Sequence, residues 1–337
     1  MRAVVVEALS GPDGAVFGDV PEPEGSHWLS PDERLLIEVH AAAISFPDLL
    51  QTRGRYQHSV PAPFVSGGEI AGVVIEAPDS SGFVPGDRVL GLARRGAMAE
   101  RALVPPGYVI ALPKRLSFAE GAAVYINYCT AWFGLHRAAL QPGESVLVQG
   151  AAGGVGTAAM EVIRAFGARS IAVVSSDEKE RAVRALGADD VVRSTGPWLE
   201  QVRELTGGRG VQVVLDMVGG DRFLDSVRSL AIGGRLVVVG FAGGSIPSVK
   251  VNRLLLRNLS LTGISMDIFE QEHPGTVATI NAAVHDLMER GLVNPLIGAR
   301  VPFENGAEAL RIMERREAIG KIVVDVRPPA GQKPTGS

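Results

Sequence analysis

A glycine-rich turn between two apolar segments is the part of this sequence best suited to chemistry. Residues 145–149 (Ser-Val-Leu-Val-Gln) have the pattern of a buried strand, and Gly150-Ala-Ala-Gly-Gly-Val-Gly156 leads into an amphipathic segment that ends at Gly167. A strand, a tight turn and a helix in this order present backbone N–H groups and the positive end of a helix dipole, which together bind a pyrophosphate.

The glycine string alone does not decide between a nucleotide site and an ordinary strand–helix turn. Ala151 stands where the first glycine of a strict G-x-G-x-x-G string is expected, whereas Gly153 and Gly156 are in place for close approach to phosphates and for helix–strand packing. Because the string is flanked by the strand and the helix that it requires, we expect a dinucleotide to bind here.

The end of the next strand indicates which dinucleotide to expect. An acidic residue at this place binds the ribose hydroxyls of NAD and repels the 2′-phosphate of NADP. Ser175 and Ser176 stand there instead and Lys179 follows, so hydroxyl groups and a cation are available to a phosphate dianion. We therefore expect NADP(H). In the alternative, Ser176 or Asp177 caps the next helix, Lys179 is a solvated surface residue, and Asp177 binds the ribose of NAD.

Composition excludes several classes of function. The 337 residues carry a formal net charge of −4, with 46% hydrophobic and 21% charged residues, which is typical of a globular protein long enough for two domains. No basic surface for nucleic acid or an anionic membrane is predicted, and no apolar run is long enough to span a bilayer. We expect no signal peptide, because the first residues lack a long apolar core and a small-residue cleavage site. We expect a cytoplasmic location, because a single cysteine fits a reducing compartment.

The residues that most often bind metals are sparse. Cys129 has no second cysteine at a zinc-ligand spacing, and the six histidines are scattered. Cys129 is expected to be a small buried side chain, with a reactive thiol as the alternative. The sequence predicts no metal site.

The pattern of predicted strands and helices changes near residue 126. The first 125 residues contain short strand patterns separated by Pro and Gly, and residues 126–266 alternate apolar strands with helices. Alternation of this kind predicts a doubly wound parallel sheet. We expect residues 267–327 to rejoin residues 1–125 as one domain, with residues 126–266 inserted as the dinucleotide-binding domain and the active site in the cleft between them. Residues 328–337 are predicted to be a disordered tail.

Short motifs spread over nearly the whole chain, to about residue 327, occur together in one known family. They are Ala41-Ala-Ala-Ile-Ser-Phe-Pro-Asp-Leu-Leu50, Gly54-Arg-Tyr56, Gly67-Gly-Glu-Ile-Ala-Gly72, Pro85-Gly-Asp-Arg-Val89, Asn127-Tyr-Cys-Thr-Ala131, Gln149–Gly156, Leu186-Gly-Ala-Asp189, Val239-Gly-Phe-Ala-Gly243 and Gly320-Lys321. In these motifs the sequence resembles the zinc-independent medium-chain dehydrogenase/reductases, and within them the NADPH:quinone oxidoreductase group. The resemblance implies a GroES-like β-rich catalytic domain, a Rossmann domain and a homodimer.

The resemblance also separates this chain from the zinc-dependent branch. In that branch a cysteine matches Ser45, and a histidine matches Gly68 in the triplet Gly67-Gly68-Glu69. The four-cysteine lobe of those enzymes is absent as well. Zinc independence is therefore expected.

The resemblance assigns cofactor contacts to particular positions. Phe46 and Thr130 would line the nicotinamide, Ser175 and Lys179 would bind the 2′-phosphate, and Arg193 would replace a family tyrosine that Ser194 does not supply. The full set of expected cofactor-binding residues is Phe46, Asn127, Thr130, Ala152, Gly153, Gly154, Val155, Ser175, Ser176, Lys179, Arg193, Phe241, Gly243 and Arg316.

A reductase without a metal favours particular substrates. Reduction of a plain ketone needs a Lewis acid or a strong hydrogen-bond donor to stabilise an alkoxide, whereas quinones and α,β-unsaturated carbonyls delocalise the developing charge. Tyr56 is the candidate proton donor, or it only packs over the substrate; Ser45 is the second candidate catalytic residue, at a position where the family commonly has asparagine. Asp48 is expected to brace the local turn.

Two other functions remain open from the sequence. One is an enoyl thioester or other double-bond reductase, which shares the fold and the cofactor. The other is an NADPH-binding protein without turnover. Neither the physiological electron acceptor nor the number of electrons transferred can be derived from the residues.

Overall fold

The computed structural model describes residues 1–25, 27, 30, 33–58 and 60–327, so the tail predicted for residues 328–337 lies outside the described residues. The chain divides into two compact units: unit 1 comprises Met1–Ile126 and the residues from Asn294 onward, and unit 2 comprises Asn127–Val293. The sequence-based boundaries at 126 and 266 remain predictions. In the structure, residues 267–293 belong to unit 2. There the ring of Phe269 packs against that of Phe133, with centroids 5.4 Å apart.

Unit 2 is built on a parallel sheet in the order β11-β10-β9-β12-β13-β14, which confirms the predicted Rossmann-type fold. Its strands are β9 (Ser145–Gln149), β10 (Arg169–Val174), β11 (Asp190–Arg193), β12 (Val211–Asp216), β13 (Leu230–Val238) and β14 (Ser260–Gly263). Its helices are α3 (Tyr125–Arg137), which begins in unit 1, α4 (Gly154–Ala165), α5 (Asp177–Ala185), α6 (Trp198–Leu205), α7 (Phe223–Ser229), α8 (Asn252–Arg257), α9 (Met266–Glu272) and α10 (Thr276–Glu289).

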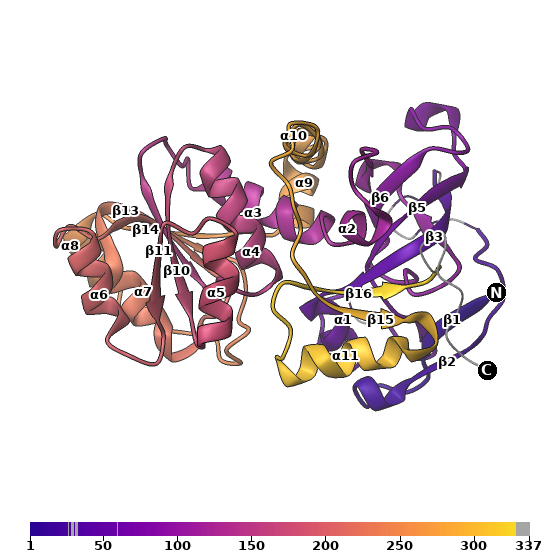
Figure 1. The fold of residues 1–337 in the computed structure, drawn as a ribbon, viewed down its shortest axis with the longest axis horizontal. Helices are drawn as coiled ribbons and strands as arrows, with labels where there is room; N and C mark the ends of the chain where they lie inside the picture. The colour runs from indigo at the N-terminus through magenta and orange to yellow at the C-terminus, as the bar shows by residue number, and fades with distance from the viewer. Residues whose placement is uncertain (26, 28–29, 31–32, 59, 328–337) are drawn as a thin grey trace. The chain divides into compact units, whose positions relative to one another are not determined.

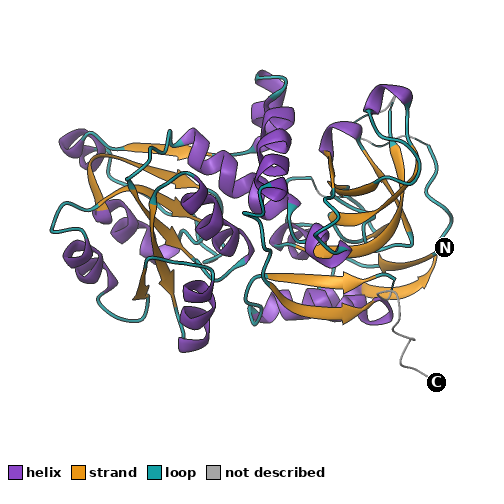
Figure 2. Ribbon diagram, turned by 45° about the horizontal axis from the view of Figure 1, so that its top comes forward, coloured by secondary structure: helices purple, strands orange, loops and turns teal. Residues whose placement is uncertain are grey.

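The apolar runs of these strands explain why the sheet is covered on both faces. Val146, Leu147 and Val148 of β9 are all fully buried, as a strand with helices above and below it requires. Helices α4 and α5 lie on one face of the sheet, and α6 and α7 lie on the other (Figures 1 and 2).

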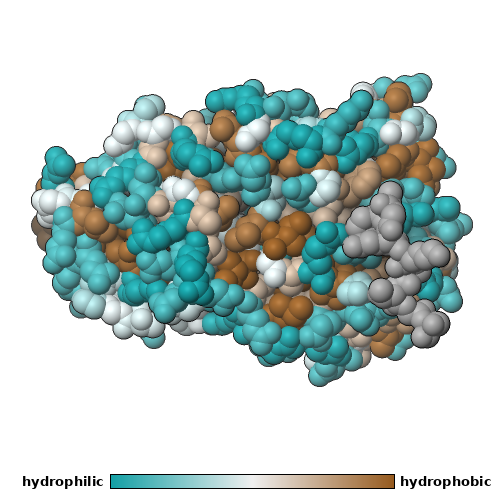
Figure 3. Space-filling view, in the orientation of Figure 1, coloured by the Kyte–Doolittle hydropathy of each residue, from teal (hydrophilic) through white to brown (hydrophobic). Residues whose placement is uncertain are grey.

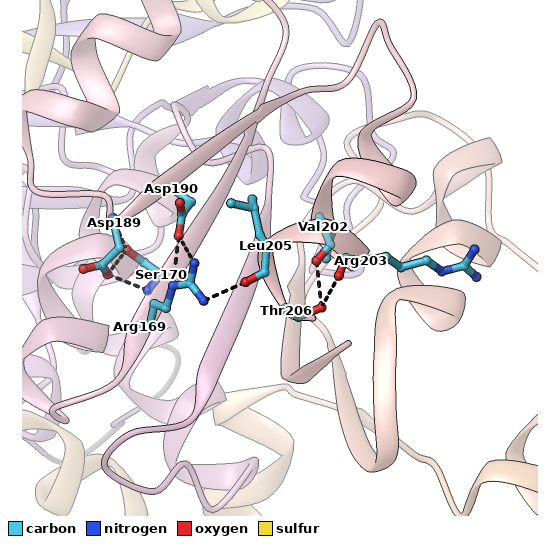
Figure 4. A network of polar contacts seen from close by, with 8 residues as sticks. All are labelled: Arg169, Ser170, Asp189, Asp190, Val202, Arg203, Leu205 and Thr206. Atoms are coloured by element: carbon cyan, nitrogen blue, oxygen red, sulfur yellow. Dashed lines mark hydrogen bonds and ion pairs between the residues drawn. The ribbon is translucent and has the colours of Figure 1, made fainter. Parts of the chain in front are cut away.

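A polar network ties the amino ends of the strands together (Figure 4). Arg169, the first residue of β10, donates to Asp190 Oδ2 of β11 at 2.9 and 2.5 Å and to the carbonyl of Leu205 in α6 at 3.1 Å. Ser170 donates to Asp189 Oδ2 through its N–H and its hydroxyl, at 2.7 and 2.9 Å. This network closes the end of the sheet opposite to the predicted site, because the glycine-rich turn and Ser175 follow the carboxyl ends of β9 and β10.

Unit 1 is β-rich, as the GroES-like prediction requires. Its larger sheet has the order β15-β16-β3-β5-β6-β8, with β7 also paired to β3, and a smaller sheet has the order β2-β1-β4. The strands are β1 (Arg2–Val6), β2 (Ala15–Asp19), β3 (Leu35–Ile44), β4 (Phe64–Val65), β5 (Glu69–Glu76), β6 (Arg88–Leu92), β7 (Arg101–Val104), β8 (Val109–Ala111), β15 (Ile297–Pro302) and β16 (Lys321–Asp325). The helices are α1 (Phe46–Gln51), α2 (Phe118–Ala122) and α11 (Gly306–Arg315).

The pairing of β3 explains how the end of the chain rejoins its beginning. β3 pairs antiparallel with β5 on one side and with β16 on the other, so residues 41–44, 69–71 and 322–325 lie on neighbouring strands. The core of unit 1 includes Ile44, Ile70 and Val324, each fully buried. β15 was not predicted, since Gly298 and Pro302 give it the composition of a loop, and only its parallel pairing with β16 makes it a strand.

The surface is that of an ordinary globular chain. On the face shown in Figure 3 most side chains are hydrophilic, and apolar ones form scattered patches. No helix in the described parts of the chain combines the length and the hydrophobicity that crossing a bilayer requires.

Candidate active site

The glycine-rich turn of unit 2 leaves the start of α4 open. In the described chain no side chain caps this helix, whose N-cap is Gly153, so the N–H groups of its first turn are available to a ligand. Gly156 is required here, because a Cβ at this position would lie 2.5 Å from the carbonyl oxygen of Gly150. The turn therefore presents backbone donors and a helix dipole to the same point, as a pyrophosphate site needs.

Asn127 lies directly against this turn. A Cβ at Gly154 would lie 2.7 Å from Asn127 Oδ1, and the Asn127 side chain is buried. Thr130 follows three residues later in α3 and is half-buried, so it shares a face of the helix with Asn127. The structure thus brings Asn127 together with Gly154, two positions that the sequence analysis could only name separately.

The serines after β10 differ in what they contact. Ser176 is the N-cap of α5 and accepts a hydrogen bond from the N–H of Lys179 at 3.3 Å, as the alternative interpretation of this segment expected. Ser175 is exposed, and the Lys179 ammonium lies 3.4 Å from its hydroxyl. Among the described residues, Lys179 has no carboxylate partner, so its charge is available to an anion.

Two loops at the carboxyl ends of β12 and β13 are joined by a residue that the sequence analysis missed. Asp216 is buried, and its Oδ1 accepts from the N–H groups of Val218 and Gly219, both at 2.8 Å. The N–H of Gly243 then donates to the carbonyl of Val218 at 2.8 Å, and the Phe241 ring would lie 2.9 Å from a Cβ at Gly219. An aspartate ending an apolar strand before Gly-Gly was the available signal. Asp216 holds the loop of Val218 and Gly219, against which the loop that carries Phe241 and Gly243 packs.

Unit 1 contributes a buried polar cluster built around Glu69. The Ser45 hydroxyl donates to Glu69 Oε2 at 2.7 Å, and Lys321 Nζ donates to Ser45 Oγ at 2.6 Å and forms an ion pair with Glu69. Glu69 Oε1 accepts from the N–H of Ile126, in the first turn of α3, at 2.8 Å. The side chains of Glu69 and Lys321 are 0% and 3% exposed, so this ion pair is shielded from water.

Hydrogen-bond accounting restricts what Ser45 can do. A serine hydroxyl has a single proton, and that of Ser45 is donated to Glu69 while Lys321 donates to its oxygen. Ser45 could donate to a substrate only by breaking its bond to Glu69. Its catalytic role stays a prediction.

Three further predicted residues of unit 1 lie on α1, in the loop after α1 and at the end of α11. Phe46 begins α1 and is 37% exposed. Tyr56 packs edge-on against His58 with ring centroids 5.7 Å apart. Arg316 is exposed and has left-handed backbone geometry at the end of α11. Their assignments to the nicotinamide, the substrate and the adenosine phosphate remain predictions.

Comparison with known proteins agrees with this geometry. Family models match at residues 31–114 (alcohol dehydrogenase GroES-like domain) and 154–281 (zinc-binding dehydrogenase). Rat quinone oxidoreductase-like protein 2 is 38% identical over 299 residues, 88% of this chain and 85% of the relative. Human quinone oxidoreductase is 31% identical over 332 residues, 96% of this chain and 97% of the relative.

Solved structures show the same likeness. The quinone oxidoreductase of Thermus thermophilus, whose structures include a complex with NADPH, is 34% identical with a TM-score of 0.80, covering 96% of this chain and all of that one. The chain belongs to the medium-chain dehydrogenase/reductase family. Its relatives include proteins named quinone oxidoreductase and quinone oxidoreductase-like protein, as the sequence motifs indicated.

The donor set of this family member does not fit the zinc ion that one matching model names. Gly68 offers no ligand, and a Cβ there would lie 3.2 Å from Asp48 Oδ1. The Lys321 ammonium already occupies the carboxylate of Glu69 and the hydroxyl of Ser45, so a divalent cation would compete with a buried positive charge. Across the described ranges, no three His, Cys, Asp or Glu side chains are grouped to hold a metal.

Asp48 is the titratable neighbour of this cluster. Its Oδ2 accepts from the N–H of Ser45 at 2.7 Å. Burial raises the pKa of its carboxyl to about 7 from an ordinary 3.8, and the charge of Glu69 acts in the same direction, whereas the Ser45 hydrogen bond and the Lys321 charge oppose it. Asp48 therefore braces the start of α1, as the sequence suggested, and does so as a group that holds its proton up to near-neutral pH.

Removing one partner of the buried ion pair should destabilise the fold. Lys321→Met leaves the Glu69 carboxylate without its cation, which costs about 3–5 kcal/mol in comparable buried pairs. In urea unfolding we expect Glu69→Gln combined with Lys321→Met to cost less than the sum of the single changes. Lys114→Met, at an exposed lysine, is the control and should change stability by less than about 0.5 kcal/mol. Additive single and double changes would contradict this coupling.

The raised pKa of Asp48 predicts how stability depends on pH. Because the unfolded carboxyl titrates near 3.8 and the folded one near 7, the folded state keeps a proton that the unfolded state releases. This contribution is fully present below pH 4 and is lost as the pH rises to 7, a change of about 4 kcal/mol at 1.36 kcal/mol per pKa unit. Asp48→Asn keeps the acceptor and should remove this component. Parallel stability–pH curves for the wild type and the variant would show that Asp48 does not titrate in this range.

Proposed function

We propose that this chain is an NADPH-dependent, zinc-independent reductase that transfers hydride to a quinone or another conjugated carbonyl. The observation that carries the proposal is the glycine-rich start of α4, which no described side chain caps, together with Lys179, which lies beside Ser175 at the next strand end and has no carboxylate partner among the described residues. The NADPH complex of the Thermus thermophilus relative supports the cofactor, and the human relative supports the substrate class. A cytoplasmic location agrees with the single, buried cysteine.

Different segments of unit 2 would each bind one part of the cofactor. The turn Ala152–Val155 would bind the pyrophosphate, and Ser175 with Lys179 would bind the 2′-phosphate. Asn127 and Thr130 of α3, with Phe241 and Gly243, would orient the nicotinamide, which supplies the hydride. Asp216 contributes indirectly, because its hydrogen bonds to Val218 and Gly219 hold the loop against which Phe241 packs.

The chemistry of unit 1 favours conjugated acceptors. No metal fits the donor set around Glu69, and the Ser45 proton is already donated to that carboxylate. Neither group is then available to stabilise a localised alkoxide. A quinone spreads the charge that hydride transfer delivers, so positioning of the two reactants supplies most of the catalysis. Tyr56 remains the candidate proton donor.

A panel of electron acceptors tests the function. NADPH oxidation should be fastest with 1,4-benzoquinone or phenanthrenequinone, slower with a simple enone and slowest with a crotonyl thioester. A metal chelator should leave the rate unchanged, whereas loss restored by zinc would contradict zinc independence. A preference for the thioester would favour the double-bond reductase. Binding of NADPH without oxidation by any acceptor would favour a cofactor-binding protein.

Lys179→Ala should weaken NADPH specifically. A charge-assisted hydrogen bond to a phosphate contributes about 1.5–3 kcal/mol, so KM for NADPH should rise roughly 10- to 100-fold. KM for NADH should barely change, because NADH has no 2′-phosphate. The NADPH effect should shrink at high ionic strength, where exposed charges are screened. An equal loss with both cofactors would mean that Lys179 is only structural.

We further propose a homodimer that pairs the edges of the two nucleotide-binding sheets. β14 lies at the edge of its sheet, and Leu255 and Leu256 of the preceding helix are 77% and 76% exposed. Exposed edges and apolar patches favour pairing across a two-fold axis. Light scattering at micromolar concentration should give twice the chain mass, and Leu255→Glu with Leu256→Glu should shift it toward the monomer. A monomeric wild type would contradict this assembly.

A further inference from the structure

Arg193, which ends β11, is held by two acidic residues of α5. Its Nε and Nη2 lie 2.9 and 2.8 Å from Glu180 Oε2, and Nη2 also forms an ion pair with Asp177 Oδ1. The cation expected to help bind the 2′-phosphate therefore already has two carboxylate partners. Lys179, on the same helix, has none among the described residues.

The two acidic residues differ in how firmly they are held. Glu180 has a second partner, because Arg184 donates to its Oε1 at 2.8 Å, and its side chain is 27% exposed. The hydrogen bond from Arg184, followed by the charges of Arg184 and Arg193, holds the pKa of Glu180 below its usual value. Asp177 is 88% exposed, and Arg193 is its one side-chain partner in the described chain. An ion pair as exposed as this contributes little stability, so another anion can replace Asp177.

The position of Asp177 places it next to the expected ribose. It is the first residue of α5, directly after the cap Ser176 and two residues after Ser175. The positive end of the α5 dipole favours any anion at this place. A 2′-phosphate bound by Ser175 and Lys179 would therefore compete with the Asp177 carboxylate for Arg193 and for the same helix end.

We propose that Asp177 determines cofactor selectivity by acting as a built-in counter-anion to Arg193. Its carboxylate opposes the phosphate of NADPH and accepts the ribose hydroxyls of NADH. The enzyme then uses both cofactors, with a preference for NADPH that Lys179 provides and Asp177 limits. This inference rests on the proposed function and adds to it the residue that sets the ratio of the two affinities.

Titration of NADPH and NADH into the full-length chain, followed by nucleotide fluorescence, tests the proposal. Asp177→Asn should tighten NADPH binding about fivefold, the upper end of what an exposed charge pair contributes, and should leave NADH binding equal or weaker. Glu178→Gln is the matched control: it makes the same charge change one residue later, at an exposed side chain without an ion pair in the described chain. It should change either affinity less than twofold.

A double-mutant cycle tests whether Asp177 acts through Arg193. Arg193→Met should weaken NADPH only slightly in the wild type, where Arg193 is paired with two acidic residues. In the Asp177→Asn background the loss should be severalfold, because Glu180 is then the one acidic partner of Arg193 in the described chain and the guanidinium can also bind the phosphate. High salt should reduce this difference. Far-UV circular dichroism reports whether each variant is folded, and Asp177→Ser provides a second neutral replacement.

The outcomes separate the two proposals. If the wild type binds neither nucleotide, the proposed function fails and this inference with it. If the wild type binds NADPH but Asp177→Asn and Asp177→Ser leave the ratio of NADPH to NADH affinity unchanged, the selectivity role of Asp177 is wrong and the proposed function stands. The same holds if Glu178→Gln shifts the ratio as much as Asp177→Asn, since the effect is then one of net charge alone.

Discussion

The buried carboxylate of Glu69 constrains the organisation of unit 1 more than any other polar group described. It accepts from Ser45 at the end of β3, pairs with Lys321 at the start of β16, and accepts from the N–H of Ile126 at the start of α3. A buried charge is tolerated only when it is paired and hydrogen-bonded. The ends of β3, β16 and α3 must therefore meet at Glu69 for the fold to be stable. Replacing one of these partners would leave the buried carboxylate incompletely paired.

The same cluster bears on the substrate class that we propose. At the two positions where the resemblance led us to expect ligands in the zinc-dependent branch, Ser45 offers a hydroxyl and Gly68 has no side chain. Lys321 supplies the positive charge near Glu69, but as a buried ammonium engaged with two partners it has a structural role. Under the proposed function, catalysis would depend on placing the hydride donor and a charge-delocalising acceptor together, rather than on a Lewis acid.

At the start of α5 in unit 2, where we propose that the ribose binds, charged side chains of both signs lie close together, along α5 and at the neighbouring end of β11. Arg193 is paired with Asp177 and Glu180, whereas Lys179 has no carboxylate partner among the described residues. Selectivity between two cofactors that differ by one phosphate can therefore depend on which ion pairs are exchanged. The presence of a lysine or an arginine in α5 or at the end of β11 does not by itself determine which cofactor is preferred.

The sequence by itself determined the class of fold and the place of the nucleotide turn. Apolar strands that alternate with helices are typical of a parallel sheet covered on both faces. The glycine spacing of residues 150–156 follows from local backbone geometry, because a Cβ at Gly156 would lie 2.5 Å from the carbonyl oxygen of Gly150. Short elements without a local signal, such as β15 and α9, could not be predicted, because pairing with β16 and packing on α3 create them.

Only the tertiary structure decided which charged side chains meet. Glu69 and Lys321 are 252 residues apart in the chain, and nothing in their local sequence shows that they form one buried pair. The pairing of Arg193 with Asp177 and Glu180, and the hydrogen bond from Gly243 to Val218, arise in the same way from strand ends that the sheet brings together. Periodicity and turn chemistry are local and can be derived from the residues, whereas ion pairs and buried hydrogen bonds depend on distances that exist only once the strands are in register.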